Sequence, residues 1–286
     1  MATQQAPPRG TVRIEAPDNN RKDAYWLAPT AILTTFTIFV VYSTIRAFMG
    51  KYFATYYDGH NFPWMAANLS GPNAIRPHYW SPFYSPYIPG YLPFLKGLKI
   101  ATWPISAALY VMVFPLAFRA SCYYCRKTYY RAVFRDPEAC AVKEKFARRN
   151  YTGESKLPAR ALNFHRYAFY AAVILVFFHW YHLYNSFFYT QNDHTKFGVG
   201  LGTIIFLIDT LALTAYTFSC HSWRHLVGGV VNRFSKAKGR FRIWSGVSRL
   251  NEYHGQFFWI SLVTVLLADL YVFLVSSGRI TDLRIF

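Results

Sequence analysis

The stretch that decides the fold is Gly255–Ser276, GQFFWISLVTVLLADLYVFLVS, an apolar run that contains one carboxylate, Asp269. About 20 such residues are enough for a helix to cross a bilayer. The sequence contains five runs of this kind: Ala24–Phe48, Ala101–Ala120, Phe164–Tyr189, Phe197–Cys220 and Gly255–Ser276. No stretch alternates apolar and polar residues as the strands of a barrel do. We therefore expect an all-α membrane protein, a bundle of five transmembrane helices.

The composition agrees with this class. Of the 286 residues, 53% are hydrophobic, 20% are aromatic and only 15% are charged, against about 25% charged residues in soluble domains. The net charge is nevertheless +18, and there are only four Cys. Together these features argue against a secreted disulfide scaffold, a disordered chain and a simple nucleic-acid-binding domain.

The distribution of Lys and Arg predicts the orientation. They number 22 in the N-terminal segment, Arg119–Asn163 and His221–His254, against 7 in the alternate segments. Basic loops stay in the cytoplasm. We therefore expect the N-terminus to be cytoplasmic and the C-terminus to be outside. The corresponding segments are a cytoplasmic N-terminal segment 1–23, a membrane domain 24–276, an outer loop 49–100 rich in Pro and aromatics, inner loops 121–163 and 221–254, and an outer tail 277–286.

The basic inner face has three explanations. It is explained first by topology and by contact with the anionic lipid bilayer, and second by a docking surface for a soluble partner. Nucleic acid is a poor third, because the basic segments lack a nucleic-acid-binding motif. No internal repeat is apparent in the sequence.

Two short motifs lie at the expected inner ends of the second and fourth spans. Cys122 and Cys125 stand three residues apart, and His221 and His225 stand four apart. If both helices continue past the membrane surface, each pair shares one helix face. Both spans run in the same direction, so the two pairs would lie at about the same depth.

Two thiols and two imidazoles suit either a tetrahedral zinc ion or a Rieske-type [2Fe–2S] cluster, and spacing alone does not choose between them. The alternative without chemistry is that these are interfacial residues that bind no metal. Four further residues lie at a similar level and are alternative ligands: Cys140, Cys220, His165 and His254.

A second polar layer is expected in the outer half of the bilayer. The helical rise places four ionisable side chains there: His179, His182, Asp209 and Asp269. Such groups are costly in lipid, and they usually face a cavity, a proton path or each other. One interpretation is an Asp–His pair that satisfies itself. The other is a quinone site in which His179 and Asp209 supply protons and neighbouring groups hold the ring.

A haem was also considered. His165 and His179 are fourteen residues apart and share a helix face, as the ligands of stacked haems do. However, the first two spans contain no His, and no other span offers a His level with His179. A single haem b near the inner surface remains an alternative.

The segments SCYYCRKTYY (121–130) and CHSWRH (220–225), with the five-span layout, resemble the membrane-anchor subunit of an actinobacterial, mycobacterial-type succinate dehydrogenase. The resemblance implies a multi-pass protein of the bacterial plasma membrane with a Rieske-type cluster, ligated here by Cys122, Cys125, His221 and His225. It also implies a flavoprotein subunit and an iron–sulfur subunit on the cytoplasmic face. Electrons would pass from them to a quinone, with menaquinone expected.

A function of another class is a proton-coupled transporter, with the deep Asp and His residues as its ion path. The sequence shows no inverted repeat with broken helices. A transporter would also leave the Cys and His motifs unexplained.

Overall fold

Long apolar helices dominate the computed structural model, which describes residues 22–49, 51–56, 75–85, 107–136, 139, 163–229 and 231–286. Four helices are long and apolar enough to cross a membrane: α1 (Leu27–Met49), α7 (His165–Ser186), α8 (Leu201–Phe218) and α11 (His254–Ser276). A fifth span results if one bent helix pair is counted as a single crossing. The prediction of a mostly helical membrane protein is confirmed, with four or five spans.

The bent pair covers the predicted second span. It consists of α4 (Ala107–Val111), α5 (Val113–Ser121), α6 (Tyr123–Tyr129) and the π-helical turn η4 (Tyr130–Phe134). The axis turns by 78° between Ser121 and Tyr123. A small interruption falls at Met112, within one turn of Pro115, a residue that breaks the hydrogen-bond pattern of a helix. The larger bend lies elsewhere, at Cys122.

Both Cys-bearing helices end at their Cys, contrary to the expectation that they continue straight on. Cys122 has extended backbone angles (φ −67°, ψ 133°), and so does Cys220 (φ −63°, ψ 144°), between α8 and α9 (His221–Gly228). Each Cys therefore occupies the N-cap position of a new helix that sets off in another direction. The assumption behind the predicted ligand spacing was wrong for this reason.

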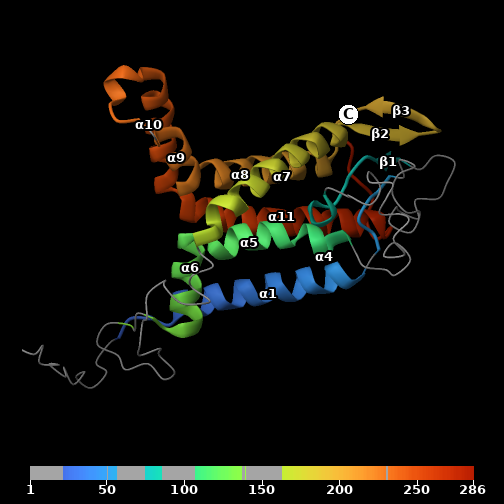
Figure 1. Cartoon of the computed structure of the whole chain (residues 1–286). Coiled ribbons are helices and arrows are strands. Elements are labelled where there is room, and N and C mark those ends of the chain that lie inside the picture. The colour runs from blue at the N-terminus through green and yellow to red at the C-terminus, as the bar shows by residue number, and fades with distance from the viewer. Residues whose placement is uncertain are drawn as a thin grey trace, which may run out of the picture.

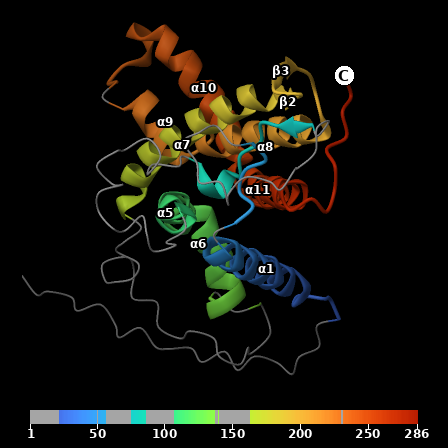
Figure 2. The same ribbon diagram turned by 90° about the vertical axis from the view of Figure 1, so that its right-hand side faces the viewer.

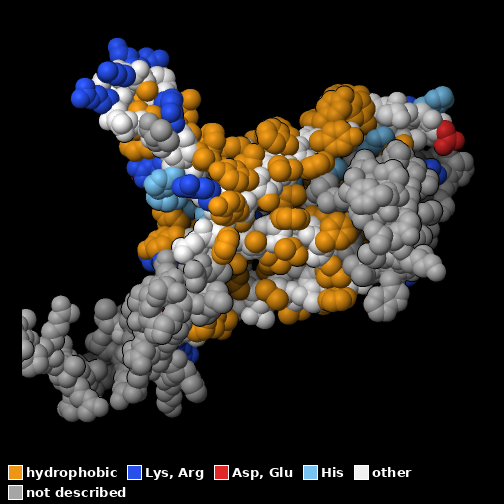
Figure 3. All heavy atoms as spheres, in the orientation of Figure 1, with side chains coloured by type: hydrophobic (Ala, Val, Ile, Leu, Met, Phe, Trp, Pro, Cys, Tyr) orange, Lys and Arg blue, Asp and Glu red, His pale blue; other side chains and the backbone are white. Residues whose placement is uncertain are grey.

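The helices form a layered bundle. Figures 1 and 2 both place α5 and α11 between α1 on one side and the α7–α8 pair on the other. In keeping with this, half of the apolar window of α11 is buried, against 17% for α1. Apolar side chains cover the middle of the bundle surface in Figure 3, as a lipid-facing surface requires.

The two ends of the bundle carry different elements, and we call them the Cys/His end and the hairpin end. The Cys/His end holds α6, α9, the short turn η6 (Phe234–Lys236) and α10 (Lys238–Glu252), which projects sideways as an arm (Figure 1). The basic side chains of the Cys/His end are seen in Figure 3. The hairpin end holds β1 (Arg76–Pro77), η2 (Pro82–Tyr84), β2 (Phe188–Gln191) and β3 (His194–Phe197).

The hairpin shortens two of the predicted spans, which had been extended to Tyr189 and back to Phe197. Strands β2 and β3 pair in antiparallel register from Phe188↔Phe197 to Gln191↔His194, and β1 adds to β2. The connecting residues Asn192 and Asp193 both have positive φ, 51° and 58°. This is the conformation of a tight two-residue turn, which Asn and Asp tolerate better than most residues.

Candidate metal centre and the pocket beside it

Two Cys–His contacts lie side by side at the Cys/His end of the bundle. The Cys122 Sγ atom is 3.3 Å from His254 Nε2, and the Cys220 Sγ atom is 3.1 Å from His165 Nε2. Both Cys and His254 are at most 2% exposed, and His165 is partly buried. The two thiols come from the ends of α5 and α8, and the two imidazoles are the first residues of α7 and α11.

Each imidazole is oriented by a serine. This serine directly precedes the cysteine that contacts the other imidazole. Ser121 Oγ lies 2.8 Å from His165 Nδ1, and Ser219 Oγ lies 2.7 Å from His254 Nδ1. Each hydroxyl already donates to a backbone carbonyl, of Ala117 and of Tyr216 respectively. The serine oxygen must therefore accept a proton from Nδ1, which leaves the Nε2 lone pair directed at the sulfur. A neutral imidazole with a free Nε2 is the form that ligates metals.

The two thiols are in their protonated form in the absence of a metal. Burial raises the pKa of the Cys220 thiol to about 11, although hydrogen bonds from the Ser222 backbone oppose the shift. A metal that binds here must displace this proton, because only the thiolate is a strong ligand.

This arrangement is built by an internal repeat that the sequence analysis missed. The segments Phe118–Cys122 (FRASC) and Tyr216–Cys220 (YTFSC) share an aromatic residue, two variable residues and Ser-Cys. Each is followed, at the start of the next long helix, by a His that lies four residues before a Phe: His165 with Phe169, and His254 with Phe258.

The aromatic residue of each repeat stacks on one imidazole. Phe118 lies 4.9 Å from His165 with an interplanar angle of 6°, and Tyr216 lies 4.8 Å from His254 with an angle of 13°. The repeat thus relates the two Cys to each other and the two His to each other. A search for such a duplicated signature would have identified these residues from sequence.

The four predicted ligands lie in different surroundings. Cys122 belongs to the buried group, and Cys125 lies one turn further along α6, buried in the same apolar cluster. His221 and His225 share a face of α9 as the spacing predicted, but they are exposed and pair with each other, Nε2 to Nε2 at 2.8 Å.

The structure describes three of the four alternative ligands. His165, His254 and Cys220 belong to the buried group, whereas Cys140 lies outside the described residues. Within the described ranges, no three His, Cys, Asp or Glu side chains come together closely enough to hold a single metal ion. The two Cys–His contacts are neighbouring pairs, because Cys122 acts electrostatically on Cys220 and His165 acts on His254.

Of the expected deep polar layer, Asp269 is fully engaged in a structural contact. Its carboxylate receives two hydrogen bonds from the Arg46 guanidinium, at 2.7 and 3.1 Å, and further ones from Tyr42 and Ser81. Both members of the ion pair are at most 2% exposed. This network fastens α1 and the segment before η2 to α11, and it does not face the pocket described below.

The other three deep residues each have separate contacts. Asp209 accepts a hydrogen bond from Thr264 at 2.9 Å, while its second oxygen is buried without a partner. His182 stacks near Trp80, and its Nε2 is likewise buried and unbonded. His179 donates from Nδ1 to the Leu175 carbonyl at 2.8 Å. No Asp–His hydrogen bond forms among these described residues.

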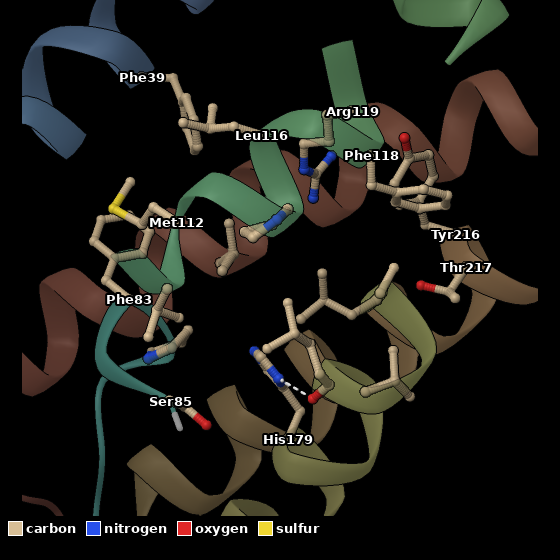
Figure 4. Close-up of a pocket in the computed structure, with 18 residues that line it drawn as sticks. Phe39, Phe83, Ser85, Met112, Leu116, Phe118, Arg119, His179, Tyr216 and Thr217 are labelled. Atoms are coloured by element: carbon tan, nitrogen blue, oxygen red, sulfur yellow. Dashed lines mark hydrogen bonds between the residues drawn. The ribbon is translucent and has the colours of Figure 1, made fainter. Parts of the chain in front are cut away.

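A mostly apolar pocket runs along the bundle from His179 to the buried Cys/His group (Figure 4). It has about 740 Å³ of empty space, part of which is open to the surroundings, and it lies between α5, α7, α8 and η2. His179 and Ser85 lie toward one end, and Phe118, Arg119, Tyr216 and Thr217 lie toward the other. Of the four deep residues, only His179 lines it. The rings of Phe118 and Tyr216 thus separate the pocket from the two imidazoles by one side chain.

Comparisons with known proteins agree with one another. The family model of the actinobacterial succinate dehydrogenase subunit SdhC matches residues 63–278. A chain of the solved structure "Mycobacterium smegmatis Sdh1 complex in the apo form" is 39% identical, with a TM-score of 0.73 and 94% of each chain covered. No curated protein sequence matches.

Proposed function

Because this chain belongs to the actinobacterial succinate dehydrogenase subunit SdhC family, we propose that it passes electrons through a Rieske-type [2Fe–2S] cluster to a membrane quinone. The chain is a membrane-anchor subunit of succinate dehydrogenase, with other subunits of that enzyme as its partners. The observation that carries the proposal is the crossed pairing of Cys122 with His254 and of Cys220 with His165.

We assign the ligand roles to Cys122, Cys220, His165 and His254 in place of the set predicted from spacing. A Rieske-type cluster has two Cys on one iron and two His on the other. The internal repeat relates the ligands in the same way, Cys to Cys and His to His.

The protein's own residues would prepare and shield this site. Ser121 and Ser219 hold the imidazoles in the ligating tautomer, and Phe118 and Tyr216 cover them on the pocket side. The cluster would supply a one-electron carrier whose potential His ligation raises above that of all-Cys clusters. Such a potential suits a late acceptor in a relay.

We further propose that the quinone occupies the pocket of Figure 4, with its ring at the Phe118–Tyr216 end. Quinone sites are concave and mostly apolar with a few polar groups, as this pocket is. A ring at this end would be one aromatic side chain away from His165 and His254. His179, at the other end, remains the proposed source of protons, while Asp209 and Asp269 do not line the pocket.

The proposed orientation places the Cys/His end in the cytoplasm and the hairpin end outside. The basic side chains gather on the Cys/His end in Figure 3, as the positive-inside rule requires. We propose that the flavoprotein and iron–sulfur subunits dock at that end, close to the four ligands. Menaquinone in the bacterial plasma membrane would then be the electron acceptor.

The ligand assignment is tested by a pair of double variants in the assembled complex. His165→Ala with His254→Ala is expected to abolish the Rieske-type EPR signal and quinone reduction, and to leave succinate oxidation by a soluble dye largely intact. The matched control, His221→Ala with His225→Ala, is expected to keep both the signal and quinone reduction. The opposite result would restore the ligands predicted from spacing.

Metal and cofactor analysis of the wild-type complex separates the remaining alternatives. Iron with acid-labile sulfide beyond the content of the partner subunits supports the cluster. Zinc in its place, or a Soret band from haem b, would contradict it. A protein with none of these cofactors that purifies without a flavoprotein subunit would return attention to the transporter hypothesis.

A further inference from the structure

Arg119 is a buried cation at the junction of the pocket and the Cys/His group. It is 7% exposed, and its guanidinium donates to the Phe258 carbonyl at 3.1 Å and to Ser261 Oγ at 3.0 Å. In the part of the chain that the structure describes, no carboxylate lies within ion-pair distance of it, although the buried Asp209 carboxylate acts on it from further away. A buried charge without a directly contacting counter-ion is costly and calls for a compensating interaction.

The surroundings of this guanidinium point toward the proposed cofactor. It stacks on the Tyr216 ring at 4.8 Å, and the same ring also stacks on the His254 imidazole. The Arg119 charge also acts on the thiols of Cys122 and Cys125. Figure 4 shows the guanidinium among the residues around the pocket, near Phe118 and Tyr216.

Comparison of the two repeats shows that only one of them carries this charge. The position after the aromatic residue is Arg119 in the first repeat and Thr217 in the second. Both side chains line the pocket, but only the first carries a charge. A symmetric scaffold for the ligands therefore has one fixed positive charge, on the side of Cys122 and His254.

We propose that Arg119 raises the reduction potential of the cofactor held by the four ligands, by compensating the electron that arrives there with a fixed positive charge. This inference rests on the proposed function. In a site of low dielectric, a nearby positive charge stabilises the reduced state strongly. Because the charge is permanent, this compensation needs no proton from the membrane interior.

A potentiometric EPR titration of the assembled complex tests this role. Arg119→Gln is expected to lower the ratio of reduced to oxidised cluster at least tenfold at a given ambient potential, which is 59 mV for a one-electron couple. Arg119→Lys, which keeps the charge, should retain most of the wild-type potential. Arg224→Gln removes a solvent-accessible charge that stacks on Trp244, and it should leave the potential unchanged.

A second variant tests the same role in case Arg119→Gln does not fold. Ser261→Asp places a carboxylate beside the intact guanidinium, so it should also lower the potential. Unchanged potentials in the correctly loaded variants would overturn the inference while leaving the proposed function intact. A raised KM for quinone with an unchanged potential would likewise overturn it, because Arg119 would then act on the quinone. Absence of any Rieske-type signal in the wild type would overturn both proposals.

Discussion

At the scale of single residues, the sequence predicted that Cys and His gather at one end of the bundle, but not which of them contact one another. Cys and His at the inner ends of the spans indicated a metal centre, and Cys122 lies in the group that the structure brings together. The i,i+3 and i,i+4 spacings favoured Cys125, His221 and His225, because they assume continuous helices. The extended backbone at Cys122 and Cys220 removes that assumption.

The orienting serines give a prediction at the same scale. Ser121→Ala with Ser219→Ala removes the acceptors that fix both imidazole tautomers, and loss of such outer partners typically weakens metal binding about 10- to 100-fold. We expect the complex to lose iron faster under chelator challenge, measured as iron per protein and as EPR amplitude. Ser277→Ala, at the hairpin end, is the control. Equal iron retention in both variants would contradict the role of the serines.

At the scale of elements, hydropathy predicted the apolar helices well, while contacts between elements decided their ends. The third and fourth spans are shorter than predicted because residues 188–197 pair as strands across the Asn192–Asp193 turn. Apolar aromatic residues at this position fit a strand as well as a helix. Only pairing with β1, from a distant part of the sequence, distinguishes the two.

The contact between α1 and α11 gives the prediction for this scale. Asp269→Asn leaves the Arg46 charge buried without its counter-ion, which typically costs about 3–5 kcal/mol of stability. We expect a clearly lower thermal unfolding temperature in detergent, with the KM for quinone unchanged in the protein that remains folded. The double variant Arg46→Met with Asp269→Leu should recover much of the loss. A raised KM without loss of stability would instead place Asp269 in the quinone site.

At the scale of the whole molecule, charge and apolar surface divide the protein into two ends and a middle. The distribution of Lys and Arg among the apolar runs predicted this division, and Figure 3 shows it. The composition did not predict that α10 projects from the bundle as a basic arm (Figure 1), because the direction of a helix after a turn depends on its packing. Here Trp244 of α10 packs against Arg224 and Gly228 of α9.

The proposed docking of the partner subunits is tested on this arm. Lys238→Glu, Arg242→Glu and Arg249→Glu together reverse three exposed charges of α10. We expect at least half of the co-purifying flavoprotein and iron–sulfur subunits to be lost, because complementary charge steers and orients association. The control reverses Lys51, Lys196 and Arg279, which are exposed near the hairpin end. Equal loss from both variants would contradict docking through α10.

The crossed Cys–His pairs have a consequence for how the protein is made. Their members are far apart in the chain, since His254 follows Cys122 by 132 positions, so no nascent fragment that lacks the last helix holds the complete set. Iron and sulfide would therefore enter only a polypeptide whose helices have already assembled in the bilayer. Insertion of the proposed cluster would then be a late checkpoint of biogenesis, at which a misassembled anchor would remain empty and open to degradation.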